Sequence, residues 1–270
     1  MSRYFGILIF MNWGLKRQIL YASVIFGLIV FVILFLIIRH QSRQVSTCFD
    51  NEQNQDERGV DCGGVCSLVC TSDAQPIAML WQRALPVTAD VYNVIAYVQN
   101  TNVAASAQNV PYTFLVYDKD NILITERSGV AIIPPNQRIA IFESGVKVGN
   151  RTPALIDFRF DEKPTWFRSQ ERFATQNIIT SSITWERQNT SPTLRADIMN
   201  TATFDMYNVR AVAIAYNAQG NAFAVSQTLV DVIPQGMRER ITFTWPTSFA
   251  ESVVRTEIVT HIDPFNQPEF

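Results

Sequence analysis

The residues with the most evident chemistry in this chain lie in one short polar segment, residues 48–70. This segment holds all four cysteines of the protein, Cys48, Cys62, Cys66 and Cys70. A segment this short and polar cannot build an apolar core, and small modules outside the cytoplasm are commonly stabilised by disulfides instead. We therefore expect a disulfide-bonded module. Four cysteines allow three pairings, and the sequence does not distinguish among them.

Metal binding is the alternative chemistry for the same segment. The spacing C-x13-C-x3-C-x3-C lacks the paired C-x2-C of zinc ribbons, which argues against zinc. Calcium prefers oxygen ligands and is compatible with disulfides. The candidate calcium ligands are Asp50, Asn54, Asp56 and Asp61. Their alternative role is to solvate a loop and bond its turns. No other cofactor is expected.

The cysteine segment resembles a motif of secreted bacterial proteins, C-x-D-G-x-x-N-x-x-E-x-x-x-D-C-G-G-x-C. The matching residues are Cys48, Asp50, Asn54, Glu57, Asp61, Cys62, Gly63, Gly64 and Cys66. Asn51 stands where the motif has Gly, and Asn is the next best residue for a positive φ. The resemblance implies a protein of the bacterial cell envelope.

An uncharged run of twenty residues, Ile19 to Ile38, precedes this segment. As a helix it would reach about 30 Å, the apolar thickness of a bilayer. We expect residues 19–38 to cross a membrane once, residues 1–18 to be cytoplasmic and residues 39–47 to be a linker. The alternative is a cleaved signal peptide, but the run is longer than such cores and no A-x-A site follows it. Met11 is an alternative start to Met1.

The location of the anchor and the cysteines predicts where the rest of the chain lies. Disulfides persist in oxidising compartments, so residues 44–270 are expected outside the cytoplasm. Lys plus Arg number 22 and Asp plus Glu number 24, a net charge of −2 that provides no electrostatic footprint for nucleic acid. About 195 residues follow Pro76, enough for two domains near 100 residues each.

Those residues contain a diverged repeat. Similar landmarks recur in the same order at offsets between 99 and 104 residues: Trp81 with Trp185, Asn100 with Asn200, Asn109 with Asn208, Tyr117 with Tyr216, Ile133 with Ile233 and Phe142 with Phe243. This pattern predicts two duplicated domains, at residues 76–162 and 163–270. The two tryptophans are expected at equivalent buried positions, and so are Tyr117 and Tyr216.

Each repeat contains runs of β-branched and aromatic residues bounded by Asn, Asp, Gly and Pro, which is typical of strands. The run Phe114 to Asp118, followed by an Ile-Pro-Pro turn, resembles the FxLYD-type bacterial module. That resemblance implies an immunoglobulin-like β-sandwich without catalytic residues. The expected fold is all-β: two tandem immunoglobulin-like sandwiches after a transmembrane helix and a small cysteine-rich module. The module is expected to be a spacer that is separate from the sandwiches.

The inventory of reactive residues argues against an enzyme. His40 and His261 lie in no catalytic motif, the cysteines are assigned to disulfides, and G-x-S-x-G, H-E-x-x-H and P-loop patterns are absent from the sequence. We therefore expect a non-catalytic, membrane-anchored envelope protein for binding, adhesion or assembly, with a protein or a glycan as partner. The alternative is a carboxylate-dependent envelope hydrolase, because two acids close in space can be far apart in sequence.

Overall fold

The computed structural model describes residues 13–41, 48–54, 56–170, 173 and 177–267. The chain divides into two compact units, residues 1–50 and 51–270. Met1, Met11 and most of the expected linker at 39–47 lie outside the described residues.

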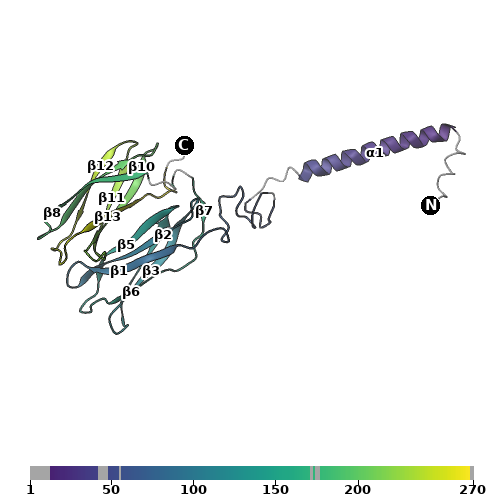
Figure 1. Ribbon diagram of the computed structural model, residues 1–270. Coiled ribbons are helices and arrows are strands. Elements are labelled where there is room, and N and C mark those ends of the chain that lie inside the picture. The colour runs from purple at the N-terminus through teal and green to yellow at the C-terminus, as the bar shows by residue number, and fades with distance from the viewer. Residues whose placement is uncertain (1–12, 42–47, 55, 171–172, 174–176, 268–270) are drawn as a thin grey trace. The chain divides into compact units, whose positions relative to one another are not determined.

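The described part of the N-terminal unit contains the helix α1 (Trp13–Gln41), drawn in purple in Figure 1. Its section Arg17–Arg39 is long and apolar enough to cross a membrane, by length and composition. The side chains of its apolar run are exposed to solvent, from Ile19 to Ile38. A helix that is apolar on all sides needs an apolar environment to cover it. The expected span at 19–38 therefore lies within one continuous apolar helix.

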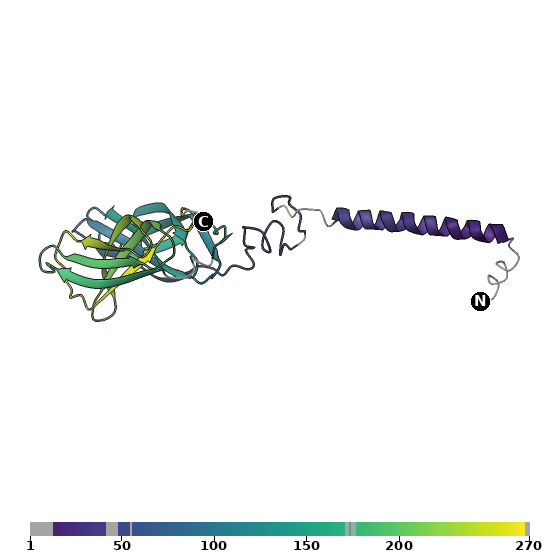
Figure 2. The same cartoon turned by 90° about the horizontal axis from the view of Figure 1, so that it is seen from above.

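The C-terminal unit consists of antiparallel sheets, which confirms the mostly β fold (Figures 1 and 2). In the first sandwich, one sheet has β1 (Ala78–Pro86), β2 (Val91–Asn100) and β5 (Gln137–Lys147), and the other has β4 (Leu123–Ile133), β3 (Ala105–Tyr117) and β6 (Leu155–Phe160), with β7 (Phe167–Arg168) paired to β3. In the second sandwich, one sheet has β8 (Ile178–Glu186), β9 (Thr193–Asn200) and β12 (Arg238–Thr244), and the other has β11 (Ala222–Ile233), β10 (Met206–Tyr216) and β13 (Arg255–His261).

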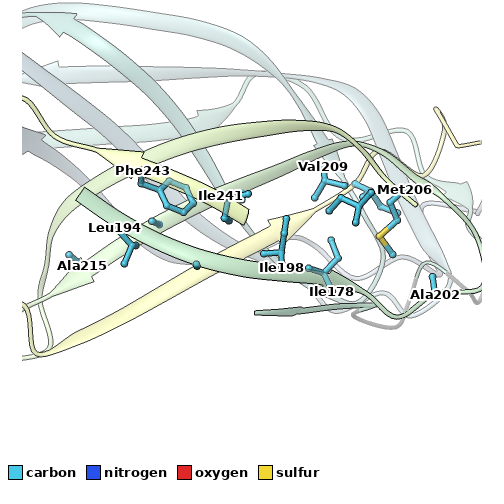
Figure 3. Close-up of a cluster of buried hydrophobic side chains, with 14 of the residues drawn as sticks. Ile178, Leu194, Ile198, Ala202, Met206, Val209, Ala215, Ile241 and Phe243 are labelled. Carbon is cyan, nitrogen blue, oxygen red and sulfur yellow. The ribbon is translucent and has the colours of Figure 1, made fainter. Parts of the chain in front are cut away.

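Alternating side chains build a separate core inside each sandwich. In the first, Val94 and Val98 of β2 belong to the same buried cluster as Phe114 and Val116 of β3. In the second, shown in Figure 3, the cluster includes Leu194, Ile198, Met206, Val209, Ile241 and Phe243. Successive strand residues point to opposite faces, so every second residue of these strands lies in a core.

The strand order of the first sandwich recurs in the second, which supports the predicted duplication. A buried asparagine marks the same position in both. The side-chain amide of Asn100 donates hydrogen bonds to the carbonyls of Ala105 and Pro134, at 2.9 and 2.8 Å. Asn200 donates in the same way to the carbonyls of Phe204 and Ile233, at 2.8 and 2.9 Å.

The tyrosine pair also follows the expected register. Tyr117 lies opposite Leu123 and Leu155. Tyr216 lies opposite Ala222 and Arg255, and these two partners lie about 100 residues after the two partners of Tyr117. Tyr216 is buried whereas Tyr117 is half-buried. The two positions are equivalent in the strand but differ in what covers them.

The expected equivalence of the two tryptophans is wrong. Trp81 lies opposite Tyr97, whereas Trp185 lies opposite Leu194. The residue of the second repeat that corresponds to Trp81 is Ser181, opposite Asp197. An irregularity between Ser181 and Thr184 shifts the register of β8, and such a bulge changes the face on which the following side chains lie.

The cysteine-rich module is not a separate spacer, contrary to expectation. Leu68 forms a β-bridge with Phe167, and the backbone amide of Val69 donates to the carbonyl of Trp166 at 2.9 Å. Val69, Ala74 and Ile77 pack against the core of the first sandwich. The later part of the module is therefore part of that domain. The module is bonded to strand β7, which lies after the domain boundary expected between residues 162 and 163. Because β7 pairs with β3, it nevertheless belongs to the first sandwich.

Candidate binding site

All four cysteines are oxidised, as expected. Cys62 and Cys70 form a disulfide with an S–S distance of 2.02 Å. Cys48 and Cys66 are also disulfide-bonded, and no cysteine is free. The module therefore offers no thiolate for zinc or for nucleophilic attack.

The proposed calcium ligands occupy a tightly turned loop. Asp50 and Asp56 are exposed, and Asn54 and Asp61 are half-buried. One carboxylate oxygen of Asp61 accepts a hydrogen bond from the backbone amide of Asn51, 3.0 Å away. Asn51 has a φ of 59°, so it takes the left-handed conformation expected from its motif position. These contacts account for Asp61 as a loop-bonding residue, and the calcium site stays a prediction.

A third apolar cluster joins the two sandwiches. It includes Leu85, Ile95 and Tyr97 from the first sandwich and Val212, Ile214 and Tyr216 from the second. These residues come from the outer faces of the sheets β1-β2-β5 and β11-β10-β13. Hydrogen bonds surround the cluster: Arg83 Nη2 donates to Asn221 Oδ1 at 2.7 Å, and Asn93 Nδ2 donates to the carbonyl of Val225 at 3.2 Å. The domains are thus packed against each other through sheet faces.

A polar network lies at the edge of this interface. Glu257 of β13 accepts hydrogen bonds from the hydroxyls of Tyr97 (2.6 Å) and Tyr216 (2.9 Å) and from Arg255 (3.0 Å). Burial acts to raise the pKa of Glu257, but the hydrogen bonds from Tyr97, Arg255 and Tyr216 outweigh it and leave the pKa below its usual range. Burial, together with Glu257, raises the pKa of Tyr216 to about 12. Glu257 is therefore an ionised link between the sandwiches.

His261 is buried near the end of β13, opposite Arg210. Its Nδ1 has no hydrogen-bond partner in the part of the chain that the structure describes. Burial, with a smaller contribution from Arg210, lowers the pKa of His261 to about 3. This histidine is neutral at physiological pH.

A cleft of about 350 Å³ opens at one end of the interface. Its lining comes from residues 85–88 of the first sandwich and from residues 222–224 and 245–251 of the second. The hydroxyl of Thr247 donates to the carbonyl of Val87 at 2.9 Å, so a bond between the domains fixes the cleft walls. Ligand pockets commonly lie at domain interfaces and have volumes of about 300–1,000 Å³.

Aromatic side chains form one wall of the cleft. Phe249 lies against Phe223, Trp245 and Trp185, with ring centroids 5.2, 5.4 and 5.6 Å away. Trp245 is buried, and its Nε1 donates to the carbonyl of Val225 at 3.1 Å. Phe223 and Phe249 are half-buried. The packed rings hold the wall in place, and the partly exposed ones offer an apolar surface.

Sequence reasoning did not identify this cleft. Its residues come from segments about 160 positions apart, and no motif links them. A local signal was present: Trp245 to Phe249 (WPTSF) places two aromatic residues and a proline in a connection between strands. Aromatic residues in a loop are unusual unless they pack or bind.

No family model matches the chain, and no curated protein matches it. Among solved structures, the chain is similar to the crystal structure of red sea bream transglutaminase, with 11% identity and a TM-score of 0.24. The match covers 70% of this chain and 31% of the transglutaminase chain. The chain thus spans about a third of that enzyme, and a likeness this low says nothing about function.

Proposed function

We propose that this protein is a non-catalytic, membrane-anchored binding protein of the bacterial cell envelope. Its paired sandwiches, of immunoglobulin-like type, lie outside the cytoplasm. The observation that carries the proposal is the cleft at the junction of the two sandwiches, which is preformed because the interface fixes both of its walls. Preformed sites avoid the entropy cost of ordering the protein when it binds.

The location rests on two features. The helix α1 has the length and composition of a membrane span, and the cysteine module is oxidised. A disulfide-bonded module persists outside the reducing cytoplasm. Protease added to intact spheroplasts is expected to degrade residues 76–270. Protection of the whole of this region would reverse the proposed orientation.

The binding function can be tested by photocrosslinking in the native membrane. Benzoylphenylalanine replaces Thr88, which lines the cleft, and Thr242, an exposed residue of β12, is the matched control position. An adduct of discrete mass from position 88, and none from position 242, is the expected result. Equal labelling from both positions, or none from position 88, would contradict binding at the cleft.

The rival function is the carboxylate-dependent hydrolase. It predicts turnover of an envelope glycan by the purified full chain, and loss of that turnover on substitution of a single acid. Such a result would replace the binding proposal.

A further inference from the structure

A short segment after the last strand connects the second sandwich to strand β7. It consists of residues 262–267, which we call the strap. Ile262 lies in the core of the second sandwich. Phe265 packs edge-to-face against Phe167 of β7, with the ring centroids 5.6 Å apart. The strap therefore begins in one domain and contacts the other through an aromatic ring.

The side chain of Gln267 takes the place of a strand partner for part of β10. The pairing of β13 with β10 extends from Tyr216 to Arg210, so it does not reach Tyr207. There the buried side chain of Gln267 accepts a hydrogen bond from the backbone amide of Tyr207 and donates one to its carbonyl, both at 3.0 Å. The protection of the Tyr207 amide from hydrogen exchange thus depends on the position of the strap.

Phe167 connects the strap to the cysteine module. Its backbone forms a β-bridge with Leu68, which lies within the loop that the disulfide between Cys62 and Cys70 closes. It also pairs with Ser106 of β3. A disulfide restricts the conformations of the loop that it closes, so its reduction is expected to loosen Leu68 and the bridge to Phe167.

The surroundings of the two rings leave room for movement. A cavity of about 220 Å³ lies beside them, and its lining includes Ser106, Ser169, Pro264 and Phe265. The hydroxyl of Ser169 is buried and has no hydrogen-bond partner among the residues that the structure describes. Close packing would make β7 and the strap move together, whereas a cavity allows the rings to separate. A shift of Phe167 is therefore expected to release Phe265.

We infer that the strap transmits the redox state of Cys62 and Cys70 to the start of β10. The reductant is a dithiol. One of its thiolates attacks the Sγ of Cys62, which is the more exposed cysteine, and Cys70 leaves as a thiolate that takes up a proton. The second thiolate of the reductant then displaces Cys62 from the mixed disulfide, which yields two cysteine thiols and the oxidised reductant. With the loop open, the contact between Phe167 and Phe265 weakens and Gln267 releases Tyr207. This connection goes beyond the proposed binding function and does not require a ligand at the cleft.

Hydrogen exchange of the full chain in lipid nanodiscs tests the connection at the amide of Tyr207. Dithiothreitol reduces the wild-type protein, and the double variant Cys62→Ser with Cys70→Ser removes this one bond. Both are expected to speed exchange at Tyr207 by about two- to tenfold, which corresponds to the loss of one edge-to-face aromatic pair. Exchange should stay unchanged at Ala213, which lies in the middle of β10 between β11 and β13.

Two substitutions of Phe265 assign the response to the strap. Phe265→Ala should raise exchange at Tyr207 in the oxidised protein to the level of the reduced protein, and reduction should then add nothing. Phe265→Tyr retains the ring and is the matched control, in which reduction should still speed exchange. The inference would be overturned by unchanged exchange at Tyr207 in the reduced wild-type protein, by an undiminished response in Phe265→Ala, or by equal increases at Tyr207 and Ala213. These outcomes do not affect the crosslinking result at position 88, so the proposed function is tested separately.

Discussion

The buried asparagines Asn100 and Asn200 are the residues that both sandwiches share most closely. Each carbonyl oxygen accepts a backbone amide two residues later, from Asn102 and Ala202, while each amide group bonds two carbonyls. Both residues are fully buried, so these backbone groups have no water to replace the asparagine. In each sandwich this asparagine closes the turn between two strands.

We predict that Asn200→Ala destabilises the second sandwich by about 3 kcal/mol. The change leaves the amide of Ala202 and the carbonyls of Phe204 and Ile233 without partners, and an unsatisfied buried group costs about 1–3 kcal/mol. Chemical denaturation of the full chain measures the loss. The control is Asn208→Gly, at an exposed position with a φ of 52°, where glycine is tolerated. Equal stabilities of the two variants would contradict the assigned role.

His261 provides a prediction for the pH dependence of stability. Its pKa is about 3 in the folded protein and about 6.5 in an unfolded chain. Below pH 6.5 the unfolded chain binds a proton that the folded protein does not. The stability supported by neutral His261 is therefore complete above pH 6.5 and falls as the pH drops, by at most about 1.4 kcal/mol per unit.

Denaturation of the full chain between pH 7 and pH 5 measures this slope. His261→Phe keeps an aromatic ring at the position and removes the titrating group, so the slope in this range should be much smaller. An unchanged slope in the variant would assign the acid sensitivity to other groups.

At the scale of strands, the link between β2 and β13 depends on Glu257. Its lowered pKa means that its contribution to stability is present above the ordinary carboxyl pKa and is lost as the pH falls further. We predict that Tyr97→Phe raises the pKa of Glu257, because the hydroxyl that bonds the carboxylate is removed. A loss of about 1–2 kcal/mol is expected, since hydrogen bonds to charged groups are among the stronger ones. NMR titration of the Glu257 carboxyl carbon checks the direction, and an unchanged pKa would contradict it.

The turn at Gly64 determines whether the cysteine module closes. A Cβ at this position would lie 1.6 Å from the carbonyl oxygen of Asp56, which is less than any van der Waals contact allows. Gly64→Ala is therefore expected to leave free thiols after oxidative refolding. Gly220 has a similar positive φ but open space around it, so Gly220→Ala isolates the cost of backbone strain alone. Thiol titration compares the two, and full oxidation of the Gly64 variant would show that the loop rearranges.

The strands themselves were predictable, but their partners were not. Runs of β-branched and aromatic residues bounded by turn residues indicate where strands lie, because each signal is local. The interface needs contacts between residues more than 100 positions apart. A partial signal exists in Ala211 to Tyr216 (AVAIAY), where an uninterrupted apolar run indicates a strand covered on both faces. The repeat pattern matched Trp81 with Trp185 incorrectly, because the irregularity in β8 cannot be recognised from its sequence.

At the scale of the molecule, the two sandwiches have different outer faces. The face that joins the sandwiches has Ile95 and Tyr97 on β2, and the corresponding residues on β9 are Arg195 and Asp197. Asp197 accepts a hydrogen bond from Arg240 at 2.9 Å, which lowers the pKa of its carboxyl. A charged face of this kind opposes the addition of a further sandwich, because packing would desolvate these charges.

The cysteine module also affects the molecule at this scale, because it contacts the first sandwich. A separate spacer would loosen alone on reduction, and the contacts of the module do not agree with that. The backbone amide of Arg168 donates to the carbonyl of Ser67 at 2.6 Å, and the amide and carbonyl of Gln75 bond the side chain of Asn102. These contacts join Ser67 of the module to β7, and they join Gln75, which follows the module, to the turn before β3. Loss of a disulfide typically removes about 2–4 kcal/mol of stability.

We therefore predict that reduction weakens the first sandwich along with the module. Hydrogen exchange of the full chain in nanodiscs, before and after reduction, measures this. Exchange should rise in residues 59–77 and also in β7 and the start of β3, since the bridge between Leu68 and Phe167 and the pairing of β7 with β3 depend on one another. The sheet β12-β9-β8 serves as the internal control, because it lies in the other domain and does not contribute to the joining cluster. Faster exchange confined to residues 48–66 would restore the spacer interpretation. Equal increases in every sheet would show that the two sandwiches unfold as one cooperative unit.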